Sequence, residues 1–379
     1  MPLRPLLPPA AVASAAAVAL LAVAPPTSGV AAAGGPPALY AVRDGRSVAV
    51  AGVDGTRRTV LRLARSSRGD VALALSGDGT RLAARHGDDA VRVVDLASGR
   101  VRTIRRTGRA VVLRFSPDGT RLAVVGARPG RFRDQLRTCA VGSRRCRIVG
   151  GRRVLGAPAW APDGRRLAWM VAVGEDAAPD LVVGDGRRSR TIARAPLRGS
   201  RVWLPESPTW DGSGVAWAST RVRLRDGELA GILASRIQRW DGQAVRTVVA
   251  RPADEGIPLA AIAPVGGGPG LVALAARDGR TSSELRLVTV DPGGTVEETG
   301  VVLGRFGYDA GDGVRGLHPL VDGRIAVVVG GADDVPGHGR RPRLQLVTIG
   351  GVGGSSGGPV VAEGDELTVA TPWPGGAPL

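Results

Sequence analysis

The sequence predicts an all-β fold: a single β-propeller of about seven four-stranded blades, with six blades as the alternative. Three observations favour this fold. Glycine (57) and proline (28) together exceed a fifth of the 379 residues, a density typical of short strands joined by turns. Apolar residues make up 43% of the chain, enough for a large core. A short motif also recurs at intervals typical of propeller blades.

The N-terminal residues 1–33 are predicted to be a secretory signal peptide. A single basic residue, Arg4, precedes an apolar run from Ala10 to Ala24, and Ala31 to Ala33 supply small residues at the exit. The run is shorter than the roughly 20 apolar residues that cross a bilayer comfortably. We expect cleavage after Ala33, with an uncleaved anchor as the alternative. No later stretch is long and apolar enough to span a membrane, so we expect a secreted or periplasm-like location.

The remaining residues, 34–379, carry the recurring motif. Its pattern is apolar, small, Pro or Gly, Asp, Gly, polar, Arg, Leu, Ala, apolar. Clear copies lie at 75–84, 115–124 and 160–169, looser ones at 42–49, 210–217 and 320–327, and a degenerate one at 263–273. The intervals between the anchoring aspartates grow from 34 residues (Asp44 to Asp78) to 48 residues (Asp163 to Asp211) and beyond. Periods of about 40 to 50 residues indicate four-stranded propeller blades.

The residues of the motif indicate a tight turn between two strands. Ser116 can hydrogen-bond the turn backbone, Pro117 presets the first turn dihedral, and Gly119 accepts a positive φ. The segment 91–104 then predicts a second hairpin within the same unit. Each unit therefore reads as strand, Asp-Gly turn, strand, loop, strand, turn, strand. No part of residues 34–379 shows a sustained helical period of apolar positions.

These repeats resemble the WD-like propeller repeats of the TolB family, whose hallmark is the Ser-Pro-Asp-Gly turn. Residues 116–119 carry this turn fully, and residues 76–79 and 161–164 carry it with one change each. The resemblance covers most of residues 37–372. It implies a periplasmic or envelope-facing interaction platform. We expect the protein to be a monomer that binds a protein or an anionic envelope polymer.

Two terminal segments are predicted to close the ring. Ala38–Val42 and Glu366–Ala370 both have the composition of strands, and the second follows a glycine-rich linker near residues 350–358. We expect the two strands to share one blade, because closure removes the open sheet edges of a propeller.

The two cysteines predict a disulfide. Cys139 and Cys146 are placed symmetrically about Gly142-Ser143, a pair suited to a two-residue hairpin turn. They would then face each other across two strands. An exported protein is also the setting in which disulfides persist.

The charge balance is strongly basic. Lys+Arg number 51 against 34 Asp+Glu, which gives a net charge of +17, and every one of the 51 is arginine. Such a balance suits a polyanion binder. However, aromatic residues reach only 3%, whereas nucleic-acid binders interleave aromatic rings for base stacking. The densest arginine clusters, at 144–153, 187–190 and 340–343, also lie beside turn residues. We therefore expect no nucleic-acid partner.

No catalytic, cofactor or metal residues are predicted. Residues 353–357 match a Gly-x-Ser-x-Gly string, but they sit in a glycine run with no histidine after them. The three histidines are scattered, and His318, just before the last Asp-Gly turn, is the best placed to face a pocket. The carboxylate pairs Asp88-Asp89 and Asp333-Asp334 suit solvated turns better than calcium sites. The remaining histidines, His86 and His338, are predicted to lie in loops.

Candidate binding residues come from the tryptophans and from two insertions. Four of the seven tryptophans fall on repeat strands and are expected in the core; the other three lie near predicted loops and are candidates. The core set is Trp160, Trp169, Trp210 and Trp217, and the candidates are Trp203, Trp240 and Trp373. The insertions are Arg223–Ser235 and Phe306–Gly316. The expected function is that of a secreted, non-catalytic binding scaffold. The alternative is a propeller enzyme or carbohydrate-binding protein whose site is built from loops.

Overall fold

All described secondary structure is β-strand. The computed structural model describes residues 38–44, 46–52, 57–63, 72–127, 134–143, 145–151, 153–172, 179–194, 201–205, 208–225, 228–252, 259–264, 270–278, 283–306, 314–319, 324–329, 343–348, 360–363 and 366–369. Its strands are β1 (Ala38–Asp44), β2 (Ser47–Gly52), β3 (Arg57–Arg62), β4 (Leu73–Leu75), β5 (Arg81–Arg85), β6 (Ala90–Asp95), β7 (Val101–Arg105), β8 (Arg109–Phe115), β9 (Arg121–Ala127), β10 (Asp134–Ala140), β11 (Cys146–Gly150), β12 (Val154–Trp160), β13 (Leu167–Val171), β14 (Asp180–Gly184), β15 (Ser189–Ala193), β16 (Arg201–Pro205), β17 (Thr209–Asp211), β18 (Gly214–Arg225), β19 (Glu228–Trp240), β20 (Val245–Pro252), β21 (Leu259–Pro264), β22 (Leu271–Asp278), β23 (Ser283–Val290), β24 (Val296–Phe306), β25 (Val314–Pro319), β26 (Arg324–Val329), β27 (Arg343–Thr348), β28 (Val360–Glu363) and β29 (Glu366–Val369).

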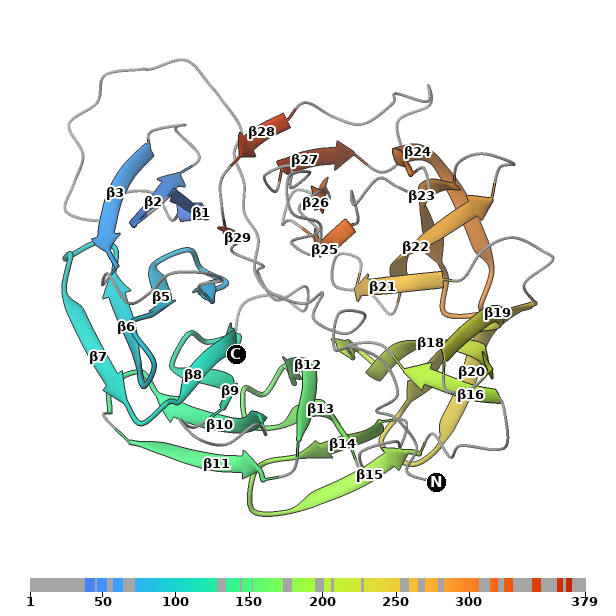
Figure 1. The fold of residues 1–379 in the computed structure, drawn as a ribbon, viewed down its shortest axis with the longest axis horizontal. Helices are drawn as coiled ribbons and strands as arrows, with labels where there is room; N and C mark the ends of the chain where they lie inside the picture. The colour runs from blue at the N-terminus through green and yellow to red at the C-terminus, as the bar shows by residue number, and fades with distance from the viewer. Residues whose placement is uncertain are drawn as a thin grey trace.

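These strands form antiparallel sheets arranged around a common centre (Figure 1). The described strands divide into seven sheets, six with four strands and one, built from β16 to β20, with five. The innermost strands β29, β4, β8 and β12 contact one another in that order, and β17, β21 and β25 continue the series. The all-β propeller predicted from the sequence is confirmed. The blade number, about seven with six as the alternative, stays a prediction, although the described sheets already number seven.

One sheet is built from both ends of the chain. Strand β29 pairs antiparallel with β1, with Tyr40 opposite Val369 and Val42 opposite Leu367, so the expected closing pair is confirmed. In this sheet the order is β29-β1-β2-β3. The turn at Asp44 therefore joins the second strand to the third, and it is not equivalent to the turn at Asp78, which joins the first strand to the second. This corrects the repeat alignment and explains why the first interval, 34 residues, is so short.

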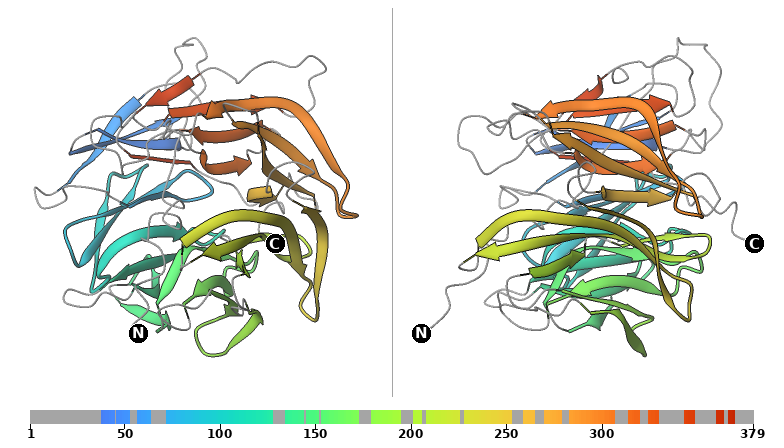
Figure 2. Two further views of the ribbon diagram at one scale, coloured as in Figure 1. Left: turned by 45° about the vertical axis from the view of Figure 1, so that its right-hand side comes forward. Right: turned by 90° about the vertical axis from the view of Figure 1, so that its right-hand side faces the viewer.

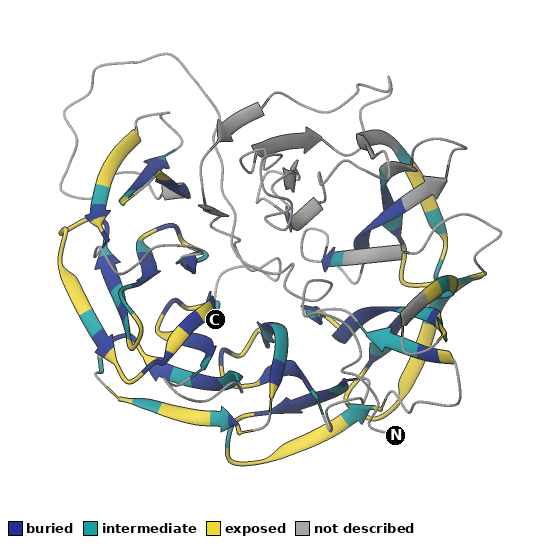
Figure 3. Ribbon diagram, viewed as in Figure 1, coloured by how far each residue is buried: buried dark blue, intermediate teal, exposed yellow. Residues whose placement is uncertain are grey.

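The core lies between the sheets, and each inner strand serves two interfaces. Along β9, Leu122 and Val124 pack toward the preceding sheet, whereas Ala123 and Val125 pack toward the following one. Because successive side chains of a strand point to opposite faces, a strand buried on both faces must be apolar throughout. This is why the motif continues as Leu-Ala-Val-Val rather than alternating with polar residues. Figure 3 shows that exposure is concentrated on the outermost strands, such as β7, β11 and β15.

The Asp-Gly turns have the geometry that the motif predicts. In the most complete copy, the Ser116 hydroxyl donates to Asp118 Oδ1 over 2.5 Å and the Thr120 N–H donates to the same oxygen over 3.1 Å. Gly119 has a φ of 65°, in the left-handed region that favours glycine. In the equivalent turns at Asp78 and Asp163, the following backbone N–H groups likewise donate to the carboxylate.

The fifth turn departs from the pattern, which corrects its alignment. Asp211 is the last residue of β17 and stands where the other copies have a serine or alanine. Its buried carboxylate accepts bonds from the N–H groups of Ser213 and Gly214. It also forms an ion pair with Arg239, with 2.7 Å between Asp211 Oδ2 and Arg239 Nη2. A charged side chain can occupy this buried position because the ion pair and the turn donors satisfy it.

Antiparallel pairing gives the ring two unlike ends. One end of the ring, which we call the turn face, holds the turns between first and second strands and those between third and fourth strands. It includes the turns at 76–80, 96–100, 116–120 and 161–165. Loops between second and third strands, and connections from one sheet to the next, lie at the opposite end, which we call the loop face; it includes residues 86–89 and 106–108. Connections on the loop face can vary in length without disturbing the turns.

The predicted disulfide is present. Cys139 on β10 lies opposite Cys146 on β11 in the strand register, and the two residues are joined by a disulfide with their Cα atoms 4.2 Å apart. The hairpin turn between them includes a bond from the Ser143 N–H to the Ala140 carbonyl. The placement of the cysteines about Gly142-Ser143 is therefore confirmed.

Several sequence predictions lie outside the described residues. They are the signal peptide (1–33), residues 307–313 of the second insertion, the glycine-rich linker (350–358), the Gly-x-Ser-x-Gly string (353–357), His338, Asp333-Asp334 and Trp373. Where the structure describes the chain, no helix has the length and apolar character needed to cross a membrane.

Candidate binding surface on the fifth sheet

Aspartates of the turns are engaged in holding the backbone. On the turn face, Asp95, Asp185, Asp241 and Asp291 cap the hairpins between third and fourth strands by accepting backbone N–H groups. These hydrogen bonds keep the pKa of each carboxyl below its usual value. A carboxylate fixed in this way stays ionised and is already used as an acceptor. These side chains are therefore poor candidates for general acid catalysis.

The candidate metal residues are not brought together. His86 lies in the loop between β5 and β6, as predicted, and burial and then the charge of Arg92 lower its pKa. Asp89, nearby in the same loop, accepts the Gly108 N–H over 2.9 Å and so fixes the connection to the next sheet. His318 lies on β25, and only its backbone is described. Within the described ranges, no group of three His, Cys, Asp or Glu side chains could hold a metal ion.

The tryptophans divide almost as predicted. The four expected in the core are buried, with exposures from 1% to 6%. Two of them tie neighbouring inner strands together: Trp160 donates to the Arg114 carbonyl over 3.0 Å, and Trp210 donates to the Ala159 carbonyl over 3.1 Å. Trp240 corrects the prediction, because it ends β19 and is buried in the same core cluster as Trp210. Of the described candidates, only Trp203 lies half-buried at the surface.

The insertion Arg223–Ser235 forms part of a long hairpin. Strands β18 and β19 have 12 and 13 residues, and they remain paired from Val215 opposite Trp240 out to Arg225 opposite Glu228. Strand β16 pairs with the outer half of β18. We call β16, residues 219–225 of β18 and residues 228–236 of β19 the extension. It belongs to the loop face, and Figure 2 (right) shows the yellow-green hairpin reaching farther to one side than its neighbours.

The extension has one apolar and one basic face. Val202 and Val222 lie opposite each other and are buried in a small cluster with Leu204 and Leu224. The intervening positions point to the other side of the sheet. There, Trp203 lies opposite Arg221, and Arg201 lies opposite Arg223. The basic face therefore carries a tryptophan among arginines.

Two arginines approach the same indole ring. The guanidinium carbon of Arg236 lies 3.9 Å from the centre of the Trp203 ring, and that of Arg221 lies 6.0 Å from it. Both are cation–π distances. Arg236 is opposite Ser219 on β18, and Ser219 is opposite Pro205 on β16. The small, buried Ser219 leaves room for the Arg236 side chain to lie across β18 and reach Trp203.

The electrostatics of this cluster are unbalanced. Burial, and then the positive charge of Arg221, lower the pKa of the Arg236 guanidinium. The Nε–H of Arg236 is buried and has no hydrogen-bond partner in the described part of the chain. None of the described carboxylates forms an ion pair with Arg221 or Arg236. Two like charges are therefore held against one ring, which is the arrangement that a bound anion would stabilise.

Two local signals in the sequence indicate the hairpin form of the insertion Arg223–Ser235. Residues 221–225 alternate between polar and apolar side chains, which is the pattern of a strand with one covered face. Asp226-Gly227 follows directly, and this dipeptide is a strong signal for a two-residue hairpin turn. Together these two signals predict a continuous hairpin. The pairing of Trp203 with Arg221 could not be derived, because it depends on the return of β16 to β18.

Comparison with known structures agrees with the architecture. The chain is similar to the tricorn protease, with a TM-score of 0.55 and 13% identity over 88% of this chain, which spans 33% of that protein. It is similar to oligogalacturonate lyase in complex with manganese, with a TM-score of 0.50 and 15% identity over 82% of this chain and 81% of the other. The fold is a β-propeller.

The β-propeller is also TolB-like in its Ser-Pro-Asp-Gly turns. A structure of putative TolB from Agrobacterium tumefaciens matches 72% of this chain and 92% of its own, with 17% identity and a TM-score of 0.40. No family model and no curated protein sequence matches the chain. At these identities the likeness describes the fold and not the activity, so the function of this propeller has to be argued from its own residues.

Proposed function

We propose that the protein is a secreted, non-catalytic TolB-like β-propeller that binds a protein or an anionic polymer of the cell envelope. The surface that binds is the basic face of the extension. The observation that carries the proposal is the cluster of Arg221, Arg236 and Trp203, in which positive charge is fixed in place without a described acidic partner. The extension projects from the loop face, where connecting segments vary and are positioned by the rigid sheets.

The non-catalytic part of the proposal rests on the way the carboxylates are used. Catalysis of the general acid–base kind needs a free group with a tuned pKa. The aspartates of the turns are held ionised by hydrogen bonds, and His86, the histidine whose side chain is described, lies in a loop beside Arg92. The similar structures include enzymes, but their low identity carries no activity to this chain.

The location outside the cytoplasm is supported by two features. Residues 1–33 have the composition of a signal peptide. The disulfide between Cys139 and Cys146 is of the kind that persists in oxidising compartments. An exported binding scaffold meets envelope polymers, many of which are anionic, and a chain with a net charge of +17 is attracted to them.

The proposal is tested by binding to an array of polymers. The array holds polygalacturonate, heparin, polyphosphate, polyglutamate and neutral dextran, and a parallel arm uses a washed cell-envelope fraction. One variant shortens the extension by replacing residues 219–236 with Asp-Gly, which removes Arg221 and Arg236; Ala218 and Ile237 are already opposite each other. We expect the wild type to bind at least one anionic probe or the envelope fraction, and the shortened variant to lose that binding. Equal binding by both proteins, or turnover of a polymer by the wild type, would contradict the proposal.

A further inference from the structure

We infer that Trp203, Arg221 and Arg236 form a clamp for the carboxylate groups of an acidic polysaccharide. The inference rests on the proposed binding function and names the ligand class for the same surface. It starts from geometry: strands β16, β18 and β19 each contribute one of the three side chains, so the clamp depends on the register of a sheet rather than on a flexible loop. A site built on strands holds its groups more rigidly than a site on loops.

The arginines are oriented, and this favours a planar oxyanion. A guanidinium that stacks on an indole keeps its plane fixed, and Arg236 lies only 3.9 Å from the ring centre of Trp203. A fixed fork of N–H donors matches the two oxygens of a carboxylate. Arg221, on the neighbouring strand, brings a second guanidinium to the same ring. A bound carboxylate would offset the repulsion between the two positive charges.

The basic residues continue beyond the clamp, and this favours a polymer over a small anion. Arg201 and Arg223 form the next cross-strand pair on the same face, and both side chains are exposed. Positions two residues apart along a strand are about 6.8 Å apart. The face therefore offers successive points of positive charge to a ligand with repeated negative groups.

The composition of the face favours a polysaccharide among polymers. A nucleic acid is bound by several aromatic rings on which successive bases stack, and this face has a single indole among its described residues. A protein partner needs an apolar core to its interface, but the apolar residues Val202 and Val222 lie on the opposite face of the extension and are buried there. A sugar acid is bound through its carboxylate by oriented cations, and Arg221 and Arg236 beside Trp203 supply two of them.

The test measures the affinity of the purified protein for polygalacturonate by calorimetry in low and moderate salt. Variants are Arg221→Ala, Arg236→Ala and Arg236→Lys, which keeps the charge but loses the planar fork. The matched control is Arg187→Ala with Arg188→Ala, which removes exposed arginines from a turn on the turn face. We expect each alanine variant to weaken binding at least about tenfold and Arg236→Lys to weaken it severalfold. The control should change affinity less than about twofold, although it removes more charge.

The outcomes separate the two proposals. If polyglutamate or polyphosphate binds as tightly as polygalacturonate, or if the control weakens binding as much as the clamp variants, the clamp is wrong and general charge explains the binding. If polygalacturonate does not bind but the shortened variant loses binding to another probe, the clamp is wrong and the proposed function stands. If the shortened variant binds every probe like the wild type, both are wrong. Unfolding curves that match the wild type show that each variant has folded.

Discussion

Arginine supplies hydrogen bonds between neighbouring sheets at regular positions. On the outermost strands, Arg102 donates to the Gly142 carbonyl over 3.3 Å, and Arg147 donates to the Gly186 carbonyl over 2.6 Å. Arg58 reaches the Leu96 carbonyl in the same way. In each case the acceptor lies in the turn between the third and fourth strands of the next sheet, 38 to 40 residues farther along the chain.

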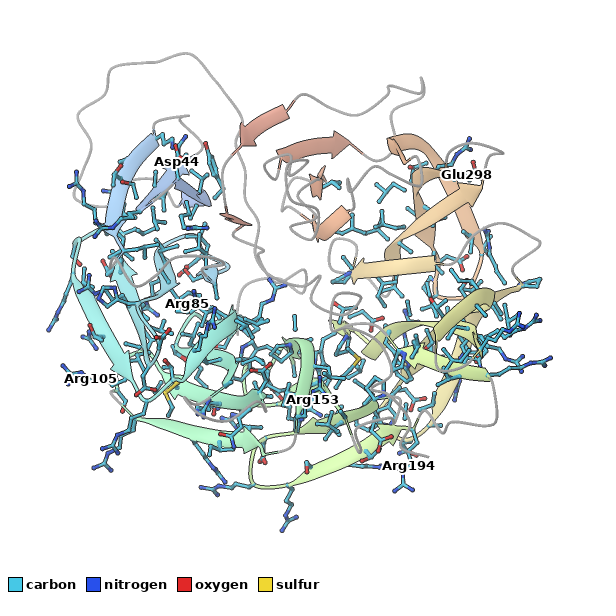
Figure 4. The ribbon with its side chains drawn as sticks, viewed as in Figure 1. Asp44, Arg85, Arg105, Arg153, Arg194 and Glu298 are labelled. Atoms are coloured by element: carbon cyan, nitrogen blue, oxygen red, sulfur yellow. A yellow bond between two sulfur atoms is a disulfide. The ribbon has the colours of Figure 1, made fainter. Side chains whose placement is uncertain are left out.

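These repeated hydrogen bonds give the arginines a structural role that the composition alone does not indicate. From the sequence, the basic balance could reflect either a polyanion partner or a compositional bias. The structure adds a third role, because a long side chain with several donors can cross the gap between two sheets. Figure 4 shows how widely these residues are spread, with Arg105 and Arg194 at the outer margin of the ring and Arg85 nearer its middle. The extension is distinct because there the arginines meet a surface tryptophan.

Replacing Asp118 tests the role of the turn carboxylates. Asp118 accepts bonds from the Ser116 hydroxyl, the Thr120 N–H and the Thr120 hydroxyl. Asp118→Ala should lower the free energy of unfolding by about 1–2 kcal/mol, because the three donors lose their acceptor. Of these donors, only the Ser116 hydroxyl has a second acceptor, the Arg121 carbonyl. Urea unfolding measures the change. The exposed Asp88, which lies in a loop outside the motif, is the matched control; a similar loss in Asp88→Ala would contradict a special role for the turn.

The same turns predict a loss of stability in acid. Burial raises the pKa of Asp78, Asp118 and Asp163, but hydrogen bonds from their turn neighbours lower it by more, so each lies below the ordinary value of 3.8. The unfolded chain therefore binds protons at a higher pH than the folded chain does. Stability from these groups is complete well above pH 3.8 and is lost as the pH falls below it through the folded pKa values.

Urea unfolding midpoints at pH 6, 4, 3 and 2 measure this loss. The midpoint should fall most steeply below pH 4. Asp118→Asn should show a shallower fall than the wild type, because one group no longer titrates. A midpoint that stays constant between pH 4 and pH 2 would show that the turn carboxylates are not stabilised in their ionised form.

At the scale of the elements, strand edges are protected by charge. Outermost strands present unpaired backbone groups, and such edges invite pairing with other chains. Strands β7 and β15 carry exposed arginines on these edges, for example Arg102, Arg105 and Arg190. This arrangement could be anticipated from the sequence only in part. The sequence indicates the alternation of polar and apolar residues in each outer hairpin. Which strand of the hairpin is outermost depends on how the ring closes, and the local pattern does not indicate this.

The hairpin of β10 and β11 has a covalent link in addition to its backbone pairing. Cys139 is buried and belongs to the core cluster between two sheets, so the link joins an outer strand to the interior. Reducing the disulfide should lower the free energy of unfolding by about 2 kcal/mol, since a loop of 7 residues restricts the unfolded chain only modestly. Thermal unfolding with and without a thiol reductant measures this. The variant Cys139→Ala with Cys146→Ala should be insensitive to the reductant, and an equal shift in that variant would point to another cause.

The motif predicts the inner two strands of the clear repeats well, but it does not align every copy with the equivalent turn of the other units. Its apolar, turn and Leu-Ala positions are local, so copies such as 115–124 translate directly into β8, a turn and β9. The copies at Asp44 and Asp211 were placed differently by the structure. Asp44 lies in the sheet shared by both ends of the chain. Asp211 occupies the position of the serine in the other turns and forms an ion pair with Arg239. Both departures depend on contacts distant in sequence, which a local pattern does not contain.

At the scale of the whole molecule, stability depends on every sheet having two neighbours. Each interface described above is filled by alternate residues of the strands on both sides, as in the cluster formed by Leu122 and Val124 with Ala83. A sheet without a neighbour would expose one such apolar face. The ring therefore has to close, and it closes through β29 and β1. The candidate binding surface is tied to this closure only indirectly, because the extension lies outside the ring on the fifth sheet.

Removing the closing strand is the sharpest test of this architecture. Deletion of residues 365–379 removes β29, whose four residues pair with β1 between Tyr40 and Arg43, and keeps β28. Tyr40, Ala41 and Val42 are buried in the intact protein, so their exposure should make the truncated protein insoluble or readily cleaved by trypsin. The matched control deletes residues 370–379 and keeps β29; it should remain soluble and resistant. If the longer deletion were as soluble and as resistant to trypsin as the control, closure by β29 would not be what holds the ring together.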